Sequence, residues 1–180
     1  MQIIESGQIS LRPFDIKDAN AVFSYRSLEE VAEYQYWHPY TEEQSVRFIE
    51  QCSLSNLKTR NQWIGLAVIH KLNQELIGDC ALKISEITAE IGCNIHPKYQ
   101  KQGFAKEILS LLLDFCFTQN NVQEIYGITD SANIASIQLM KSIHMTRSTQ
   151  FEEKSICKGV LSIEHKYSIN KSDWIKLKQS

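Results

Sequence analysis

The sequence lacks the features that place a chain in a membrane, outside the cell or around a metal ion. No apolar run reaches the roughly 18 residues needed to span a bilayer. The first residues, MQIIESGQ, have no basic start followed by an apolar core, so no secretory signal is expected. The five cysteines are isolated, without a CxxC pair or a Cys/His spacing typical of metal sites. We therefore expect free thiols in a cytoplasmic protein, with no metal and no membrane partner.

An excess of charge of one sign is also missing. The chain has 19 Lys and Arg against 21 Asp and Glu, a formal net charge of −2, which argues against a nucleic-acid partner. The charge is nevertheless uneven, because residues 1–50 carry nine acidic and four basic residues. This distribution suits an anionic cofactor held by the later part and a cationic acceptor beside the first part. Solvated helix faces would explain the same acidic residues.

Only three prolines and seven glycines interrupt the 180 residues, and no repeat or linker divides them. We expect one domain over residues 1–180. Apolar periodicity and turn residues predict α and β elements in alternation. In chain order, we expect a strand within 3–12, a helix starting at 15 and carrying Ala19, Val22 and Phe23, and helices at 28–34 and 41–58. Strands at 62–70, 76–84 and 89–95 follow, then a helix from 104, a strand at 125–129 and a helix opening at 131–133. A closing hairpin of 145–151 with 160–169 and a short basic tail from 170 complete the chain.

The most informative stretch is a strand, a polar turn and a buried helix over residues 89–117. From Phe104 the apolar residues recur at helical spacing, so one broad face of this helix is expected to be buried. The N–H groups and dipole at such a helix start form a seat for a phosphate or pyrophosphate. Gly103 permits close approach of the backbone to the anion, and Lys101 and Lys106 add positive charge. An ordinary strand–turn–helix junction would show the same pattern.

The turn reads Gln100-x-x-Gly103-x-Ala105, which resembles the pyrophosphate-binding signature of the Gcn5-related N-acetyltransferases (GNAT). Further segments resemble the branch of this family that contains ribosomal-protein alanine and spermidine acetyltransferases (RimJ/RimL-like): ISLRPFDIKDA, IGDCAL, AEIGCNIHPKYQ and NIASIQLMKSIHM. The last segment ends in His144-Met145 where the family usually has Gly-Phe. The resemblance implies an α/β (α+β) fold, with a mixed, mostly antiparallel sheet of about seven strands flanked by helices.

The resemblance also implies that acetyl-CoA is the acetyl donor. Its pantetheine arm is expected to lie between two splayed parallel strands, along the backbone of Cys93, Asn94 and Ile95. Asn133 is expected to bind the same arm, and helix capping is the alternative role for this side chain. The residues expected around the pyrophosphate are Gln100, Lys101, Gln102, Gly103, Phe104, Ala105 and Lys106.

Acetyl transfer to an amine requires loss of an amine proton, stabilisation of the carbonyl oxygen and departure of the thiolate. Glu90 is the candidate general base, because a carboxylate within an apolar strand is costly unless it is paired or useful. An outward-facing Glu on a half-exposed strand is the alternative. Ser136 is the candidate partner of the departing sulfur, or else a helix-start residue. Cys93 is expected to be a small apolar side chain, because the family forms no covalent enzyme intermediate.

The acceptor is the least determined part. Tyr36, Trp37 and His38 lie in an aromatic, non-periodic segment that either lines the acceptor pocket or packs on the core. The resemblance implies an N-acetyltransferase acting on a protein N-terminus, a polyamine or another small amine, in a chain that could form a homodimer. The alternative is a non-catalytic acyl-CoA-binding regulatory module.

Overall fold

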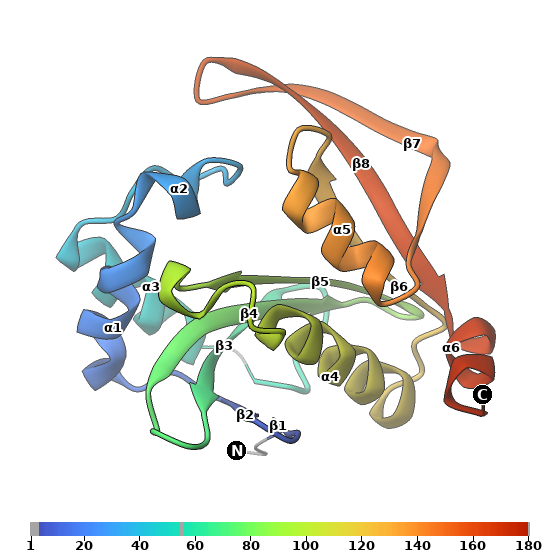
Figure 1. Cartoon of the computed structure of the whole chain (residues 1–180), viewed down its shortest axis with the longest axis horizontal. Coiled ribbons are helices and arrows are strands. Elements are labelled where there is room, and N and C mark those ends of the chain that lie inside the picture. Colours follow the sequence, from blue (N-terminus) through green and yellow to red (C-terminus); the bar gives the residue numbers. More distant parts are fainter. Residues whose placement is uncertain (1–3, 55, 180) are drawn as a thin grey trace.

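The computed structural model describes residues 4–54 and 56–179, which form one eight-stranded sheet with helices on both faces (Figure 1). The strands are β1 (Ile4–Glu5), β2 (Ile9–Arg12), β3 (Trp63–His70), β4 (Leu76–Ile84), β5 (Thr88–Ile95), β6 (Glu124–Asp130), β7 (Thr146–Cys157) and β8 (Val160–Asn170). The α-helices are α1 (Ala19–Arg26), α2 (Glu29–Ala32), α3 (Glu42–Ser53), α4 (Phe104–Gln119), α5 (Ile134–Ser142) and α6 (Lys171–Gln179). Two 3₁₀ turns, η1 (Ile16–Asp18) and η2 (Pro97–Tyr99), precede α1 and α4.

The strand order is β1-β2-β3-β4-β5-β6-β8-β7, and β5 with β6 is the one parallel pair in this sheet of described residues. This pair is short: only Thr88–Glu90 is in register with Glu124–Tyr126. Beyond Glu90 the two strands continue without pairing to each other, as 91–95 and 127–130. We call this divergence the fork. It confirms the expected mixed, mostly antiparallel sheet with one splayed parallel pair.

Two apolar layers fix the helices on the sheet. The α4 side chains Ile108 and Leu112 are fully buried among β-strand residues of one face, and α5 contributes Met140 to the same layer. On the other face, Tyr25 of α1 and Ile49 of α3 pack with strand residues of β3. Both layers follow from the period-2 alternation of the strands and the 3.6-residue periodicity of the helices. No helix within the described ranges is long and apolar enough to cross a membrane.

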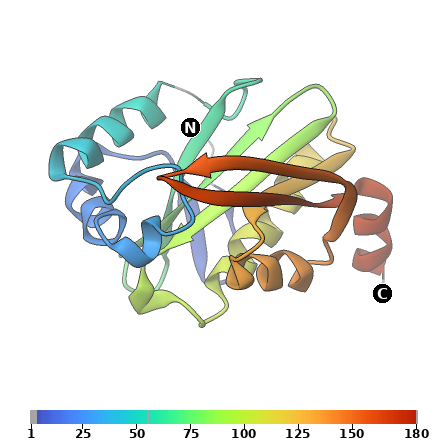
Figure 2. The ribbon, with the colours of Figure 1, turned by 90° about the horizontal axis from the view of Figure 1, so that it is seen from above.

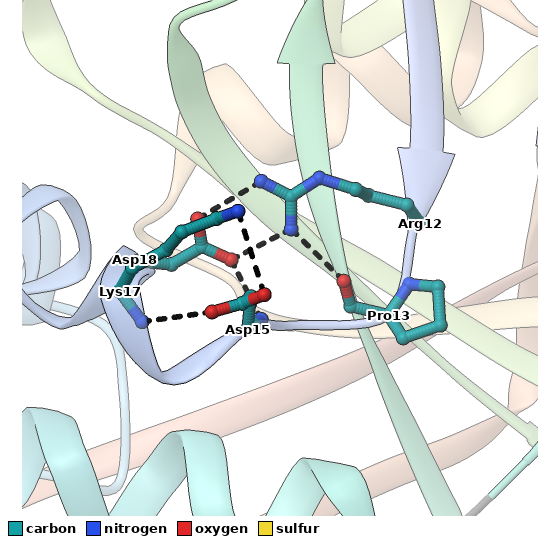
Figure 3. A network of polar contacts seen from close by, with 5 residues as sticks. All are labelled: Arg12, Pro13, Asp15, Lys17 and Asp18. Carbon is teal, nitrogen blue, oxygen red and sulfur yellow. Dashed lines mark hydrogen bonds and ion pairs between the residues drawn. The ribbon is translucent and has the colours of Figure 1, made fainter.

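A polar network holds the connection from β2 to α1 (Figure 3). Arg12 donates to both oxygens of Asp18, at 2.6 and 2.9 Å, and also to the carbonyl of Pro13 at 2.9 Å. Asp15 and Asp18 form a reciprocal capping box at η1. Because Asp18 is buried, the bidentate Arg12 contact compensates its removal from water. The Asp18 hydrogen bond is also the main reason that the pKa of Arg12 is raised.

The hairpin of β7 and β8 projects across one side of the sheet toward α2 (Figures 1 and 2). Its turn, Lys158-Gly159, is tied to α2, because Lys158 Nζ donates to the carbonyl of Ala32 at 2.5 Å and to that of Glu33 at 3.3 Å. The hairpin is longer than the sequence indicated: β7 runs to Cys157 rather than ending near Phe151. It carries four unpaired residues between Arg147 and Glu152, where the register shifts.

The helices differ from expectation at three places, one of which is the end of α3, at Ser53 rather than near Lys58. The tail forms α6, which was missed, and its Trp174 donates to Asp114 of α4 at 3.0 Å. The α2 helix covers only Glu29–Ala32 rather than 28–34. The α5 helix ends at Ser142, and His144 takes the left-handed conformation at φ 65°, where glycine is the usual residue. The absence of glycine therefore leaves the end of the helix unchanged but imposes backbone strain on His144.

Candidate active site

The N-terminus of α4 is an uncapped helix start. Gly103 occupies the N-cap position at φ 91°, and no side chain in the described part of the chain caps the helix. The first N–H groups of a helix have no partner within it, so those of the first turn are available to a ligand. A Cβ built on Gly103 would meet none of the residues in 4–54 and 56–179 within 4 Å, so the space beside this backbone is open to them. The residues present thus fit a bound pyrophosphate at the place that the sequence indicated.

The turn before α4 is attached directly to the fork. The side-chain nitrogen of Gln100 donates to the carbonyl of Ile95 at 3.0 Å, and that of Gln102 to the carbonyl of Lys98 at 2.9 Å. Lys101 has φ 59° and is exposed, as is Lys106. Gln100 and Gln102 therefore shape the turn, whereas the two lysines supply its positive charge.

Both arms of the fork lead to a helix start. β5 continues through η2 to α4, and β6 continues through residues 131–133 to α5, so the starts of α4 and α5 lie toward the same end of the molecule (Figure 1). Asn133 is the N-cap of α5, and its Oδ1 accepts from the backbone N–H of Ser136 at 3.1 Å. The capping role weighed from the sequence is thus present. It uses the oxygen of Asn133 and leaves the amide nitrogen as the group suited to a cofactor.

The β5 arm of the fork contains the residues expected beside the pantetheine arm. On its other side it pairs with β4, with Cys93 opposite Cys80 and Asn94 opposite Asp79. The backbone edge facing β6 is unpaired with that strand beyond Glu90. Burial of the Cys93 thiol raises its pKa to about 12, so it is a poor nucleophile at neutral pH.

Glu90 is the last β5 residue paired with β6, which places it at the vertex of the fork. Its neighbours Ala89 and Ile91 belong to the α4 layer, so the alternation of the strand directs Glu90 to the opposite face. Burial raises the pKa of Glu90, and this effect outweighs the attraction of Lys83 and the hydrogen bond from the Tyr126 hydroxyl. A half-buried carboxylate with a raised pKa suits proton transfer.

The surroundings of Glu90 were not identified from the sequence. Tyr126 lies opposite it on β6, and Lys83 opposite it on β4. Lys166 of β8 stands 4.2 Å from the Tyr126 ring and forms an ion pair with Glu124 at 3.0 Å. Each of these residues is ordinary in its own strand, and only the pairing of four strands brings them together.

The structure places the three expected acceptor residues in different surroundings. His38 lines a hollow of about 410 Å³ together with four residues from α2, the loop after it and the hairpin turn: Glu29, Glu30, Glu33 and Lys158. Tyr36 is 68% exposed, and its hydroxyl hydrogen-bonds Glu164 of β8. Trp37 instead packs against Tyr40, with ring centroids 4.9 Å apart, and takes the core-packing alternative.

The hollow is predominantly acidic, and further acidic residues follow from it toward the fork. Glu164 lies opposite Asp130, the last residue of β6, and burial together with Glu164 raises the pKa of Tyr36. Three glutamates against one lysine on the hollow's wall make it attractive to a cation. Among the described residues, no group of three or more His, Cys, Asp or Glu side chains could hold a metal ion.

A further polar cluster lies beside the fork. Asp79 of β4 is 2% exposed and forms a bidentate ion pair with Arg26 of α1, at 2.8 and 2.9 Å. Burial alone would lower the pKa of Arg26, but Asp79 outweighs it and the pKa is raised. A charged residue within the apolar strand LIGDCALKI is the signal that could have revealed Asp79. Its partner Arg26 lies 53 residues away in the chain and gives no local pattern.

Comparison with known proteins places this geometry in a family. The sequence profile described as "Acetyltransferase (GNAT) domain" matches residues 8–146. The chain is 30% identical to the uncharacterized N-acetyltransferase YnaD of Bacillus subtilis, over 95% of this chain and 98% of that protein.

Two similar solved structures contain coenzyme A. One is spermidine N-acetyltransferase from Vibrio cholerae in complex with CoA and spermine, with a TM-score of 0.78 and 20% identity over 94% of this chain and 99% of that one. The other is RimL, the ribosomal L7/L12 alpha-N-protein acetyltransferase, in complex with coenzyme A, with a TM-score of 0.80 and 17% identity over 94% and 98%. These similarities show the fold.

Proposed function

Because the chain belongs to the GNAT family of acetyltransferases, we propose that it transfers acetyl from acetyl-CoA to the primary amine of a cationic small molecule or a protein N-terminus. The observation that carries this proposal is the fork. The parallel pair opens immediately beyond Glu90, and both of its arms lead to helix starts. A donor held at these helix starts and an acceptor on the opposite face would meet at one carboxylate.

The donor would be held by backbone more than by side chains. The first-turn N–H groups of α4, from Phe104 to Lys106, would bind the pyrophosphate, and Lys101 would add charge. The unpaired edge of β5 at residues 93–95 would bind the pantetheine arm as an added strand. Asn133 would donate its amide N–H to the same arm. Related structures that contain coenzyme A support this assignment.

When bound, acetyl-CoA supplies an acetyl group whose bond to sulfur breaks as its bond to the amine nitrogen forms. A primary alkyl amine is mostly protonated at neutral pH, with a pKa of about 10, so a proton must leave before attack. Glu90 would accept this proton, directly or through a water. The N–H of Ile95 would polarise the carbonyl oxygen, and Ser136 would hydrogen-bond the departing sulfur.

The acceptor would approach through the acidic hollow beneath the hairpin turn. Glu29, Glu30 and Glu33 line it from α2 and the residue after it, and Glu164 lies farther along β8. Such a surface concentrates cationic amines and disfavours anionic ones. The spermine in the related spermidine N-acetyltransferase structure is consistent with this class of acceptor.

The test measures release of free CoA from acetyl-CoA with a panel of amines of similar length: a diamine, a triamine, a monoamine ether with a single charge, an amino-acid-like zwitterion and short peptides with free N-termini. We expect the cationic members to give the highest kcat/KM and a rise in ionic strength to reduce it. Release of CoA with none of these amines, despite micromolar binding of acetyl-CoA, would refute the transferase assignment. Equal turnover of zwitterion and triamine would refute the cationic acceptor alone.

A further inference from the structure

Asp79 is a buried carboxylate with no place in the chemistry described above. It accepts four hydrogen bonds: from Arg26 Nε at 2.9 Å and Nη2 at 2.8 Å, from the Tyr25 hydroxyl at 2.5 Å and from Asn94 Nδ2 at 3.1 Å. Taking a carboxylate out of water is costly unless each oxygen is paired. Here both oxygens are paired, and the donors come from α1 and from the β5 arm of the fork.

The Asn94 contact fixes the β5 arm against β4. Asn94 lies four residues beyond the last residue paired with β6, where the strand is held from one side only. The β4 backbone approaches closely there, because a Cβ built on Gly78 would lie 2.2 Å from the Asn94 carbonyl oxygen. The side-chain bond to Asp79 and this close approach together determine the direction in which the free edge of β5 points.

The Arg26 contact extends from the same carboxylate to the aromatic segment after α2. Arg26 Nη1 donates to the Tyr40 hydroxyl at 3.1 Å, and the backbone N–H of Tyr40 donates to the Arg26 carbonyl at 2.9 Å. The guanidinium carbon lies 3.9 Å from the Phe48 ring centroid and 4.8 Å from that of Trp37. The segment that carries Tyr36 and His38 at the acceptor side is thus anchored on Arg26.

We propose that Asp79 is a positioning residue. Through Asn94 it holds the free edge of β5, where the cofactor is proposed to bind, and through Arg26 it holds the segment of Tyr36 and His38 on the acceptor side. Both substrate-binding surfaces are thus fixed by the same carboxylate. This inference rests on the proposed function, because it assigns the two surfaces to the donor and the acceptor. Stability alone does not require such a cluster, since well-packed apolar residues replace buried ion pairs at little cost in many proteins.

Asn94→Ala tests the cofactor arm, because it removes one hydrogen bond and leaves the Asp79–Arg26 pair intact. We expect the Kd of acetyl-CoA to rise about 5-fold, the effect of one lost hydrogen bond. We also expect amide hydrogen exchange of residues 91–95, measured without cofactor, to become faster. The matched control is Asn120→Ala, which also loses a side-chain bond, from Arg60 at 2.7 Å, at the far end of α4. It should leave the Kd unchanged.

Tyr40→Phe tests the acceptor arm by removing the hydroxyl that accepts from Arg26. We expect a rise of about 2- to 5-fold in the KM of the amine, larger than the change in the Kd of acetyl-CoA. In the double variant, the losses of kcat/KM should be non-additive because both arms act through one carboxylate. Strictly additive losses would refute the shared fixed point.

The outcomes separate the two proposals. In one outcome the unaltered protein binds acetyl-CoA and releases CoA, but Asn94→Ala and Asn120→Ala have the same Kd and the same rate of amide hydrogen exchange at residues 91–95. The positioning role is then refuted, and the proposed function stands. If the unaltered protein neither binds acetyl-CoA nor transfers acetyl, the proposed function fails, and the positioning role fails with it.

Discussion

Gly103 offers a direct test of the anion seat at the start of α4. Replacement by alanine at φ 91° places an L-residue in the left-handed region, which costs about 1–2 kcal/mol. Alanine also lowers the conformational entropy of the unfolded chain, which stabilises the folded protein by about 0.4–1 kcal/mol. The added methyl meets no atom of the residues that the structure describes, so no further clash is expected. The net loss is about 1 kcal/mol, or roughly 2–4 °C in Tm for a chain of this size.

Gly159 in the β7–β8 turn provides a matched control. It also has a positive φ, 81°, and its Cβ would also meet nothing within 4 Å. Gly159→Ala should therefore lower Tm by a similar amount, about 2–4 °C. The two variants differ in one respect: the methyl at position 103 occupies the space where the pyrophosphate is proposed to lie.

The assay is calorimetric titration of both variants with acetyl-CoA. A methyl that displaces the anion from one backbone N–H should cost about 1.5–3 kcal/mol, which is roughly a 10- to 100-fold rise in Kd. Gly159→Ala should change the Kd by less than about 2-fold, and acetylpantetheine, which has no pyrophosphate, should not distinguish the variants. Equal Kd values of acetyl-CoA for Gly103→Ala and Gly159→Ala would refute the assignment of the seat.

The remaining predictions concern three side chains. Glu90→Gln should abolish most turnover yet leave Tm at pH 7 equal or higher. Burial raises the pKa of Glu90 in the folded protein, so the contribution of this carboxyl group to stability is lost as pH rises through that pKa. A Tm of Glu90→Gln that is lower than that of unaltered protein at pH 7 but equal to it at pH 4 would contradict this sign. In unaltered protein, kcat/KM should fall as pH drops through a pKa above the ordinary value of a glutamate. His144→Gly should raise stability by about 0.5–1 kcal/mol in a denaturant titration, because it relieves the left-handed strain; no gain would mean that the His144 side chain compensates the strain. Asp18→Ala should lower stability by about 2 kcal/mol, or roughly 4–8 °C in calorimetry, because it leaves Arg12 without its bidentate partner; a change below about 1 °C would show that water replaces it.

Local sequence patterns correctly predicted the helices and strands that begin or end at turn residues or glycine. The strand Leu76–Ile84 was bounded correctly by the turn at Asn73-Gln74, and α4 begins at Phe104 because Gly103 starts it. The tail helix α6 was missed because most of its residues are exposed, and it is held by contacts with α4 that no local pattern reveals. The second half of β7 was missed for a similar reason, since it is defined by pairing with β8.

The candidate site was also predictable only where its residues are close together in the sequence. The turn Gln100–Gly103 lies directly before the helix that it begins, so its position at the helix start is encoded locally. The surroundings of Glu90 arise from the pairing of β4, β5, β6 and β8, and Asp79 meets Arg26 across 53 residues. Contacts of this kind depend on strand register, which a single sequence does not specify for distant segments.

The fork also separates two continuous parts of the chain that can fold one after the other. The elements from β1 to α4 lie within residues 4–119, and those from β6 to α6 within 124–179, so each side of the fork is continuous in sequence. Within the sheet of described strands, three residue pairs of β5 and β6 join the two sides. During synthesis, the first side can therefore assemble before the second has emerged, with the edge of β5 still exposed. We expect the arrival of β6 and the docking of Lys158 onto α2, 126 residues apart in the chain, to be the last steps of folding.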